Sequence, residues 1–498
     1  MGKSIVIIGS GIAGLAAGVY ARMNGYETVV FESHDKPGGV CTAWQRNGYT
    51  IDGCLHYLVG SAPGHEFHRF WTELGALQGQ HIVNMDQLYR FETADGRVFN
   101  MYCDIDRLEA EMLRVSPGDA KHIRSLCTGL RGFTKFNLVR EKPPQVSSIL
   151  DNAKMMARMT PSLPAVVKWS RLTLGEVSAG FENPLLRHAW SYWHDEMSAM
   201  AFMTNLAWFN NKTAGYLEGG SMSLARAIES RLLGLGGKVR YRSRVSRVIV
   251  EGNRAVGVQL ESGEEHRADY IVSAADGRST IFGMLAGEYA DDKIKERFDT
   301  GVKFPPILCI GLGVKRTFDD FPQMIEGLAL LLEKPIDLGG KQVGHFTTHA
   351  YNFDPTMAPS GKTTLVLTVD SDYEFWNSLR SDMGRYREEK ARVADALVGI
   401  LNERFQGLSG QVEMTDVATP ITFERYTGNW RGHYQAWMPT PKTLTANAQM
   451  TLPGLEGFYM IGQWTSYGGL PTAASTARNA VQVICRRDGK RFQTYSTQ

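Results

Sequence analysis

The sequence predicts an α/β protein in which a Rossmann-like domain, assembled from separate parts of the chain, is combined with an inserted mixed α+β domain. Three glycine-rich units predict this fold, near the N-terminus, near residue 220 and near residue 462. Each lies beside a strand-length apolar run or a helix-length segment, as α/β nucleotide-binding proteins require. With 498 residues, the chain is long enough for about three domain-sized units or for two domains with insertions.

Composition excludes several functional classes. The formal net charge is only +2 and no nucleic-acid-binding motif occurs, so nucleic acid is not an expected partner. The six cysteines form no Cys-x-x-Cys pair, which argues against a zinc site or a disulfide framework, and no metal is expected. No signal peptide and no apolar run of transmembrane length are seen. We therefore expect a cytoplasmic protein with reduced thiols.

The N-terminal residues match a dinucleotide-binding unit. A β-branched run over residues 4–8 predicts a buried strand, followed by a glycine turn, a helix over residues 15–24 and a second strand over residues 27–31. Gly9 permits the tight turn, Gly11 lets a pyrophosphate approach the backbone, and Gly14 lets the helix pack closely. The helix N-terminus offers free N–H groups to that pyrophosphate. Glu32 follows the second strand and is expected to accept hydrogen bonds from ribose hydroxyls.

A second glycine pair decides between FAD and NAD. Residues 36–39 read Lys-Pro-Gly-Gly just beyond Glu32, which resembles the second glycine motif of the amine oxidase and phytoene desaturase superfamily. The resemblance implies FAD as the cofactor, with this turn lying along the diphosphate. Val40 departs from the pattern, because many relatives have arginine at that position.

Two later units resemble the remaining FAD-binding segments of that superfamily. In the middle of the chain, we expect a helix over residues 223–233 and strands over residues 238–241, 245–251, 255–261 and 266–274, and the resemblance places Val245 beside the adenine. Near the C-terminus, we expect a strand that ends at Gly462 and a helix over residues 472–487, and the resemblance implies that the N-terminus of this helix points at the flavin ring. The complete set of expected cofactor contacts is Gly9, Gly11, Ile12, Ala13, Gly14, Glu32, Ser33, Gly38, Gly39, Val40, Thr42, Val245, Asp276, Gly462, Gln463, Gly469 and Leu470.

The spacing of these units predicts the domain organisation. Residues 1–74, 215–281 and 440–498 would form a discontinuous Rossmann-like FAD-binding domain. Residues 75–214 and 282–439 would form the inserted mixed α+β substrate domain. No second strand-associated GxGxxG is found, so no dedicated NAD(P)H domain is expected. The electron donor or acceptor stays open among the substrate, oxygen, a quinone and a diffusible reductant.

Taken together, the chain resembles the phytoene desaturase-like family, which includes carotenoid desaturases, carotenoid isomerases and retinol saturases. The resemblance implies an FAD-dependent oxidoreductase acting on carbon–carbon bonds of an apolar polyene, isoprenoid or lipid-like substrate. The sequence Ile-Gly-Gln-Trp at residues 461–464 departs from typical phytoene desaturases and looks more like the isomerase and saturase branch or an uncharacterised bacterial branch.

Residues 135–171 combine basic and apolar side chains, which is typical of a segment that lies on an anionic membrane. Peripheral membrane contact by helices in this segment is therefore expected, while the alternative is a solvated basic helix pair that covers the substrate domain.

Candidate acid–base residues are few. His56 and Tyr57 follow a turn that the family places close to the flavin, and Asp195 lies in a segment rich in aromatic residues and methionine. Ionisable groups among apolar neighbours are candidates for proton transfer to or from the substrate. The alternative for Asp195 and Glu196 is that they cap a helix.

Other functions stay open at this point. A non-redox double-bond isomerase that requires reduced FAD would transfer no net electrons. An amine oxidase would oxidise a carbon–nitrogen bond, and no cysteine lies in the C-terminal flavin loop to attach the flavin covalently. A flavoprotein that binds a lipid without turnover is the remaining alternative.

Overall fold

A computed structural model describes residues 2–136, 140–444 and 449–496. Its first layer of regular structure is a parallel sheet made from three distant parts of the chain. The strands lie in the order β10 (Lys238–Arg240), β2 (Glu27–Phe31), β1 (Ser4–Ile8), β14 (Tyr270–Ser273) and β20 (Phe458–Met460). The prediction of an α/β fold with a Rossmann-like parallel sheet is confirmed.

Each face of this sheet is covered by a different layer. Ile5 and Ile7 of β1 pack with helices α1 (Ile12–Met23), α10 (Gly220–Gly234) and α15 (Leu470–Arg487). Val6 and Ile8, which point the other way because side chains alternate along a strand, pack with the antiparallel sheet β11 (Val245–Glu251), β12 (Arg254–Leu260) and β13 (Glu265–Arg267). The parallel sheet is therefore buried on both faces, as its continuous apolar strands require.

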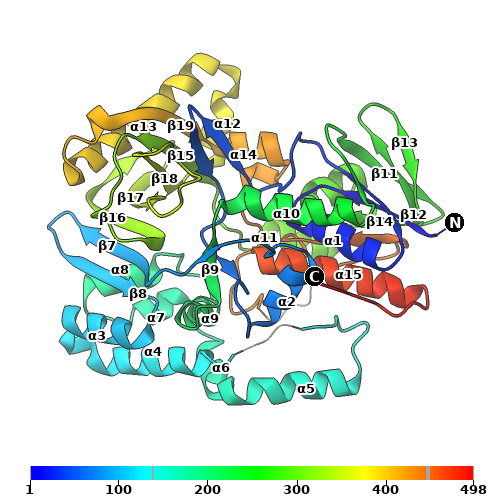
Figure 1. The fold of residues 1–498 in the computed structure, drawn as a ribbon, viewed down its shortest axis with the longest axis horizontal. Coiled ribbons are helices and arrows are strands. Elements are labelled where there is room, and N and C mark those ends of the chain that lie inside the picture. The colour runs from blue at the N-terminus through cyan, green and yellow to red at the C-terminus, as the bar shows by residue number, and fades with distance from the viewer. Residues whose placement is uncertain (1, 137–139, 445–448, 497–498) are drawn as a thin grey trace.

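A second, larger sheet lies on the other side of the molecule (Figure 1). Its order is β19 (Val412–Ala418), β15 (Ile307–Val314), β18 (Thr363–Asp370), β17 (Gln342–Ala350), β16 (Met324–Asp337), β7 (Gln87–Thr93) and β8 (Val98–Tyr102). The β16–β7 pair is parallel and the other pairs are antiparallel, so the sheet is mixed. The division of the chain into cofactor and substrate segments stays a proposal, which these two sheets support.

Helices cover both faces of the mixed sheet. One face packs with α12 (Tyr373–Ser378) and α13 (Met383–Arg404). The opposite face packs with α3 (Ile105–Val115), α4 (Ala120–Phe133), α8 (Pro184–Ser191) and α9 (Ala199–Asn210). The remaining elements named below are α2 (Glu66–Glu73), α5 (Ile149–Met159), α6 (Leu163–Trp169), α7 (Leu174–Ser178), α11 (Asp292–Thr300), α14 (Pro420–Thr427), β3 (Ala43–Arg46), β4 (Tyr49–Asp52), β5 (Leu58–Val59), β6 (Ile82–Val83) and β9 (Ala214–Leu217).

The single strand predicted over residues 266–274 is wrong. The structure divides this segment into β13, which pairs with β12, and β14, which pairs with β1 and β20. Asp269 lies between the two strands, and its carboxylate accepts hydrogen bonds from the backbone N–H and the hydroxyl of Ser4. These contacts hold Asp269 beside the start of β1, so the chain leaves the antiparallel sheet after β13 and enters the parallel sheet at β14.

Several predicted helices start later than the observed ones. The first helix begins at Ile12 rather than at residue 15, α10 begins at Gly220, and α15 begins at Leu470. In each case, glycine or proline lies in the first turn or at the N-cap. Because these residues have low helix propensity, a prediction from propensity starts the helix after them. Among the described residues, no helix is long and apolar enough to cross a membrane.

Candidate functional site

One continuous cavity of about 1680 Å³ joins the glycine loops of the parallel sheet to a chamber beside the mixed sheet. This volume exceeds the roughly 300–1,000 Å³ of a typical ligand pocket, so it has room for more than one ligand. The cavity is lined by Gly9, Gly11, Ile12, Ala13, Glu32, Ser33, Gly38, Gly39, Val40, Thr42, Val245, Asp276, Gly462, Gln463, Gly469 and Leu470, and also by His56, Tyr57 and Asp195. Of the residues predicted for the site, only Gly14 lies outside the lining.

Gly14 has the packing position that the fingerprint predicts. A methyl group built on Gly14 would lie 1.9 Å from the carbonyl oxygen of Gly9. Gly9 itself has a φ of 93°, which is strained for any residue with a side chain. A methyl group on Gly11 would instead meet the Gly38 carbonyl oxygen at an ordinary contact distance of 3.8 Å, and the Gly11 backbone lines the cavity. The first turn is therefore shaped for close approach by a ligand.

Two helix N-termini at the cavity lack side-chain caps. The N-cap residue of α1 is Gly11 and that of α15 is Gly469, and no side chain accepts a hydrogen bond from the first turn of either helix. Uncapped N–H groups and the helix dipole favour negative charge at such positions. Both N-termini suit a bound dinucleotide. The N-terminus of α1 would lie at its diphosphate, and the N-terminus of α15 would lie at a ring that gains negative charge on reduction.

Glu32 already holds the backbone of the first turn in place. Its Oε2 accepts hydrogen bonds from the backbone N–H of Ser10 at 2.7 Å and from the Ser10 hydroxyl at 2.9 Å. Its Oε1 accepts a hydrogen bond from the backbone N–H of His34 at 2.8 Å. The carboxylate also lines the cavity and remains the expected ribose acceptor.

The middle unit contributes Val245 and Asp276 to the cavity. The Asp276 carboxylate accepts hydrogen bonds from the backbone N–H groups of Ser279 at 2.7 Å and Trp430 at 3.0 Å. Burial raises the pKa of Asp276 above its usual value, although these hydrogen bonds oppose the rise. Asp276 therefore joins the end of β14 to the loop after α14.

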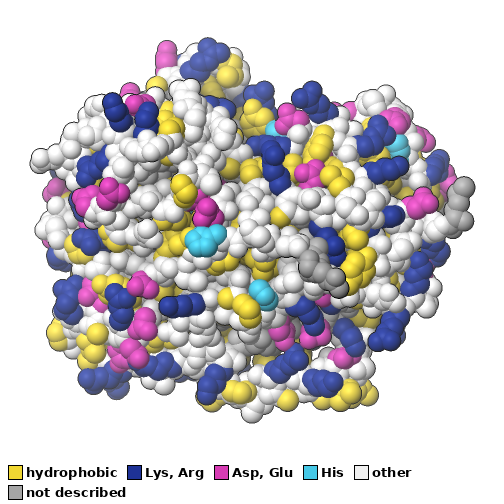
Figure 2. Space-filling view, viewed as in Figure 1, with side chains coloured by type: hydrophobic (Ala, Val, Ile, Leu, Met, Phe, Trp, Pro, Cys, Tyr) yellow, Lys and Arg dark blue, Asp and Glu magenta, His cyan; other side chains and the backbone are white. Residues whose placement is uncertain are grey.

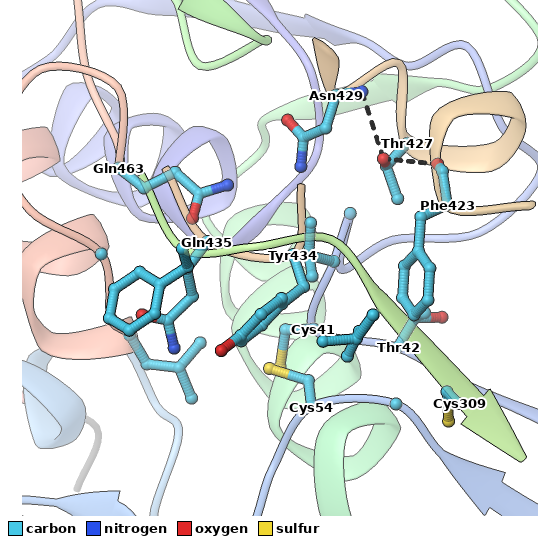
Figure 3. A pocket seen from close by; sticks show the side chains of 18 of the residues that line it. Cys41, Thr42, Cys54, Cys309, Phe423, Thr427, Asn429, Tyr434, Gln435 and Gln463 are labelled. Carbon is cyan, nitrogen blue, oxygen red and sulfur yellow. Dashed lines mark hydrogen bonds between the residues drawn. The ribbon is translucent and has the colours of Figure 1, made fainter. Parts of the chain in front are cut away.

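The C-terminal unit closes over the first one. The backbone N–H of Gly462 donates to the hydroxyl of Thr476 at 2.9 Å. A methyl group on Gly462 would touch the Cβ of Ala13 at 3.4 Å, so the loop after β20 lies directly against the start of α1. Figure 3 shows Gln463 and Gln435 on one side of the pocket, with Tyr434 between them and the cysteine pair Cys41 and Cys54.

Beyond these loops, the cavity becomes a chamber rich in aromatic and methionine side chains. Its walls come from the mixed sheet and from the segment that contains α8 and α9. The apolar and aromatic side chains of this part are Tyr57, Val59, Phe67, Tyr89, Phe136, Tyr192, Trp193, Met197, Met200, Trp208, Phe304, Ile307, Val366, Phe423 and Tyr434. Such a lining favours an apolar ligand.

His56 lies in this chamber in an ion pair with Glu326. The Nδ1 atom of His56 is 2.7 Å from Oε2 of Glu326, and both residues line the cavity. Burial opposes the charged imidazole, but the carboxylates of Glu326 and Asp52 raise the pKa of His56 above its usual value. A protonated His56 beside an apolar chamber can donate a proton, and its neutral form can accept one.

His349 lies behind this pair. It is 2% exposed, and neither of its ring nitrogens has a hydrogen-bond partner. Burial, followed by the charge of His56, holds the pKa of His349 well below its usual value. His349 is therefore neutral, and the positive charge of the group is confined to His56.

Asp195 and Tyr57 differ sharply in their surroundings. Tyr57 is half-buried against Phe209, and burial together with the Glu326 charge raises its pKa well above its usual value, so its hydroxyl stays protonated. Asp195 is exposed at the rim of the cavity. The alternative that Asp195 and Glu196 cap a helix is wrong, because Ser198 is the N-cap of α9 and its hydroxyl accepts from the Ala201 N–H.

The chamber also has a polar end along β17. His345 contacts the rings of Tyr192 and His188, and the Tyr192 and Thr347 hydroxyls are 2.5 Å apart. Burial lowers the pKa of His188 to about 4, and its Nε2 is buried without a partner. His345 and His349 are four positions apart on β17, which is about 13 Å along a strand. The polar end is therefore well separated from the His56–Glu326 pair.

Sequence reasoning missed Glu326 and His349. Glu326 is an acid inside the apolar strand β16. On β17, His349 follows His345 by four residues, so the two histidines lie on one face of β17. A buried acid is almost always paired with a basic group, so the acid in this apolar strand was a signal to look for a basic partner such as His56. Among the described residues, no group of three His, Cys, Asp or Glu side chains could hold a metal ion.

Comparison with known proteins gives the same assignment over most of the chain. The family described as flavin containing amine oxidoreductase matches residues 12–485. The lycopene-forming phytoene desaturase of a Paracoccus species is 23% identical, over 97% of this chain and 97% of its own. The chloroplastic prolycopene isomerase of Daucus carota is 24% identical, over 92% of this chain and 75% of its own. The structure of cyclohexylamine oxidase from Brevibacterium oxydans is similar in fold, with a TM-score of 0.60, 16% identity and coverage of 98% and 100% of the two chains.

Proposed function

The chain belongs to the family of flavin-containing amine oxidoreductases, and on that premise we propose that it transfers hydride to or from a carbon–carbon bond of an apolar, isoprenoid-like substrate. The family assignment makes the protein an FAD-dependent oxidoreductase. The substrate class is the proposal. The observation that carries it is the aromatic and methionine-rich chamber, which is continuous with the FAD-binding loops.

FAD supplies a ring that accepts or donates hydride. The backbone turns at Gly9–Gly11 and Gly38–Gly39 would hold its diphosphate, and Glu32 would hold its ribose. The uncapped N-terminus of α15 would stabilise negative charge on the reduced ring. Every one of these positions lines the same cavity, so the residues fit the cofactor.

The protein's own residues would bind the substrate, exclude water and control one proton. The apolar chamber would hold an extended chain, since its wall follows β17 from Thr347 towards Gln342. Hydride transfer to an olefin leaves a carbanion-like carbon that needs a proton, and hydride removal leaves a cation that must lose one. The ion pair with Glu326 would keep a proton on Nδ1 of His56 and leave Nε2 free to exchange a proton with the substrate.

The polar end of the chamber favours a substrate with one oxygenated end. His188, Tyr192 and His345 offer neutral hydrogen-bonding groups to a hydroxyl or carbonyl. A hydrocarbon without polar atoms would leave the buried Nε2 of His188 unpaired and would therefore bind less well. We propose an amphipathic isoprenoid in preference to a pure hydrocarbon.

The helices α5 and α6 support entry of such a substrate from a membrane surface. Ile149, Leu150 and Met156 on α5 and Leu163 and Val167 on α6 are between 44% and 90% exposed. These five are among eleven large hydrophobic side chains that are exposed in the described part of the chain, and α5 has no buried residue at all. Figure 1 shows α5 and α6 at the lower edge of the molecule, and Figure 2 shows hydrophobic and basic side chains together along that edge. The exposed basic side chains of Lys154, Arg158 and Lys168 lie on these two helices. This surface fits an anionic membrane.

The second candidate is a double-bond isomerase that requires reduced FAD, and the similarity to a prolycopene isomerase favours it. The same chamber would serve both reactions. The mass of the product distinguishes them, because desaturation or saturation changes the mass by one hydrogen pair and isomerisation does not. We expect a mass change after incubation of FAD-loaded protein with an isoprenoid alcohol and an electron acceptor or donor. An unchanged mass with a new double-bond geometry would instead establish the isomerase.

A further inference from the structure

Two cysteines lie opposite each other at the end of the β3–β4 hairpin. In the hairpin, Ala43 pairs with Asp52, and the next pair along the two strands is Thr42 with Gly53. Cys41 and Cys54 come next, just beyond the two strands, and would face each other if the same register continued by one position. Both cysteines line the cavity, next to the Gly38–Gly39 turn and to the turn that precedes His56.

The hydrogen-bond register brings the two cysteine backbones close together. The N–H of Gly53 donates to the carbonyl of Thr42 at 3.0 Å, so Thr42 and Gly53 form a hydrogen-bonded pair. Because the two kinds of pair alternate along an antiparallel ladder, Cys41 and Cys54 would form a non-hydrogen-bonded pair in a continued register, and the Cα atoms of such a pair are about 4.5 Å apart. A disulfide requires Cα atoms roughly 4.4–6.8 Å apart. The two positions therefore meet the geometric requirement.

The side chains are also in contact. The Cys41 thiol donates a hydrogen bond to the Ser221 carbonyl at 3.8 Å, and the neighbouring Cys54 thiol together with burial raises the pKa of Cys41 well above its usual value. Cys41 is 3% exposed and Cys54 is half-buried at the cavity wall. In Figure 3 the two side chains lie next to each other beneath Tyr434. All six cysteines of the chain are free thiols in this structure.

We propose that Cys41 and Cys54 form a reversible disulfide in the wall of the cofactor cavity, with hydrogen peroxide as the oxidant. The Cys54 thiolate attacks one peroxide oxygen, the O–O bond breaks, and hydroxide leaves to take up the thiol proton as water. The Cys41 sulfur then attacks the Cys54 sulfenic acid, the S–O bond breaks, and a second water leaves with the Cys41 proton. Each sulfur loses one electron and the peroxide is reduced to two waters.

The surrounding contacts hold both cysteines ready for this bond. Asp52 accepts hydrogen bonds from the backbone N–H groups of Cys54 at 2.9 Å and Ser221 at 2.7 Å, which fixes the Cys54 backbone to the start of α10. The Cys41 backbone is fixed by its hydrogen bond to the Gly38 carbonyl at 3.1 Å. A disulfide would therefore tie the two turns that flank the cofactor without moving either far.

Peptide mapping of the full-length, FAD-loaded protein tests this inference. The protein is treated with hydrogen peroxide, quenched in acid, alkylated under denaturing conditions and digested. We expect a cross-linked peptide pair that contains Cys41 and Cys54 in most molecules and that dithiothreitol separates. Cys54→Ser and Cys41→Ser should abolish it, whereas Cys309→Ser should retain it, since Cys309 also lines the cavity but is outside the hairpin.

The amount of hydrogen peroxide is chosen so that the exposed side chain of Met156 is oxidised to the sulfoxide, which shows that the peroxide has reacted with the protein. If Cys41 remains a free thiol at a dose that oxidises Met156, the inference is wrong, whether Cys54 is then unmodified or oxidised to the sulfinic acid. The result does not depend on the substrate, so failure here leaves the proposed function untouched.

Discussion

The imidazole ring of His349 stacks on that of His56, with ring centroids 5.0 Å apart and an interplanar angle of 9°. Two charged imidazoles could not lie in this arrangement in a buried site. The carboxylate of Glu326 pairs with the His56 ring, so it selects which of the two histidines carries the proton. The stack therefore concentrates the acid–base function on one ring.

Replacing Glu326 by glutamine tests this arrangement. Glu326→Gln removes the carboxylate that raises the pKa of His56, so this pKa should fall by about one unit or more. The change can be followed by NMR titration of the His56 ring protons and as a shift of the pH–rate profile to lower pH. Glu218→Gln is the matched control, because Glu218 contacts His81 at the same 2.7 Å on the surface. An unchanged His56 titration in Glu326→Gln would exclude the ion pair.

The buried neutral histidines predict loss of stability in acid. Burial lowers the pKa of His433 to about 4, so the unfolded chain binds a proton near pH 6.5 that the folded chain does not. The free energy of unfolding should fall as the pH drops from about 6.5 towards 4, by up to about 1.4 kcal/mol per pH unit for this histidine. His56 acts in the opposite sense, because its raised pKa favours folding at low pH.

Denaturant unfolding at several pH values measures this dependence. His433→Asn should flatten the pH dependence, because asparagine can still donate to the Phe304 carbonyl that His433 contacts but does not titrate. His81→Asn, at a side chain that is 70% exposed, should leave the pH dependence unchanged. Equal slopes for all three proteins would contradict the assignment.

The two glycines Gly14 and Gly18 of α1 should tolerate alanine very differently. A methyl group on Gly14 would overlap the Gly9 carbonyl at 1.9 Å, whereas on Gly18 it would meet only the end of the Leu232 side chain at 2.9 Å. Gly14→Ala should therefore destabilise the protein by about 3 kcal/mol or more and release FAD. Gly18→Ala should be nearly neutral, since helix propensity compensates. Thermal unfolding and FAD content per chain give the comparison, and equal values for both variants would rule out this packing.

Membrane contact through α5 and α6 predicts a specific binding defect. The double substitution Ile149→Glu and Val167→Glu should weaken binding to vesicles of phosphatidylglycerol and phosphatidylcholine by about tenfold or more, because burial of each apolar side chain is worth about 1.5 kcal/mol or more. Leu233→Glu changes a side chain that is 48% exposed but lies on α10, and it should bind normally. Vesicle flotation measures both, and unaltered binding by the double variant would place the contact elsewhere.

The N-terminal cofactor loop could be predicted from the sequence because local chemistry determines it. Position 9 requires a positive φ and position 14 requires close packing. Only glycine meets either requirement, so the two glycines occur at a fixed spacing in the sequence. The division between β13 and β14 could not be predicted, because it depends on the distant contact between Ser4 and Asp269. Local apolar patterns do not record such a contact.

The chamber was less accessible to sequence reasoning. His56 and Tyr57 were candidates because they lie near the cofactor turns in sequence, whereas Glu326 and His349 reach His56 only through the pairing of β16 with β17. The order of strands in a mixed sheet depends on long-range packing that a single sequence does not show. Asp195 illustrates the converse, because it lies among aromatic residues in the sequence and is exposed at the rim in the fold.

Anaerobic absorbance of the FAD-loaded protein tests the central claim most directly. The oxidised flavin band near about 450 nm is recorded while isoprenoid alcohols, isoprenoid hydrocarbons and primary amines are added in turn, first to the oxidised and then to the reduced protein. We predict that an isoprenoid alcohol either bleaches the oxidised band or restores it in the reduced protein, more readily than a hydrocarbon, and that amines do neither. Bleaching by an amine alone, or a protein that cannot be loaded with FAD, would contradict the account.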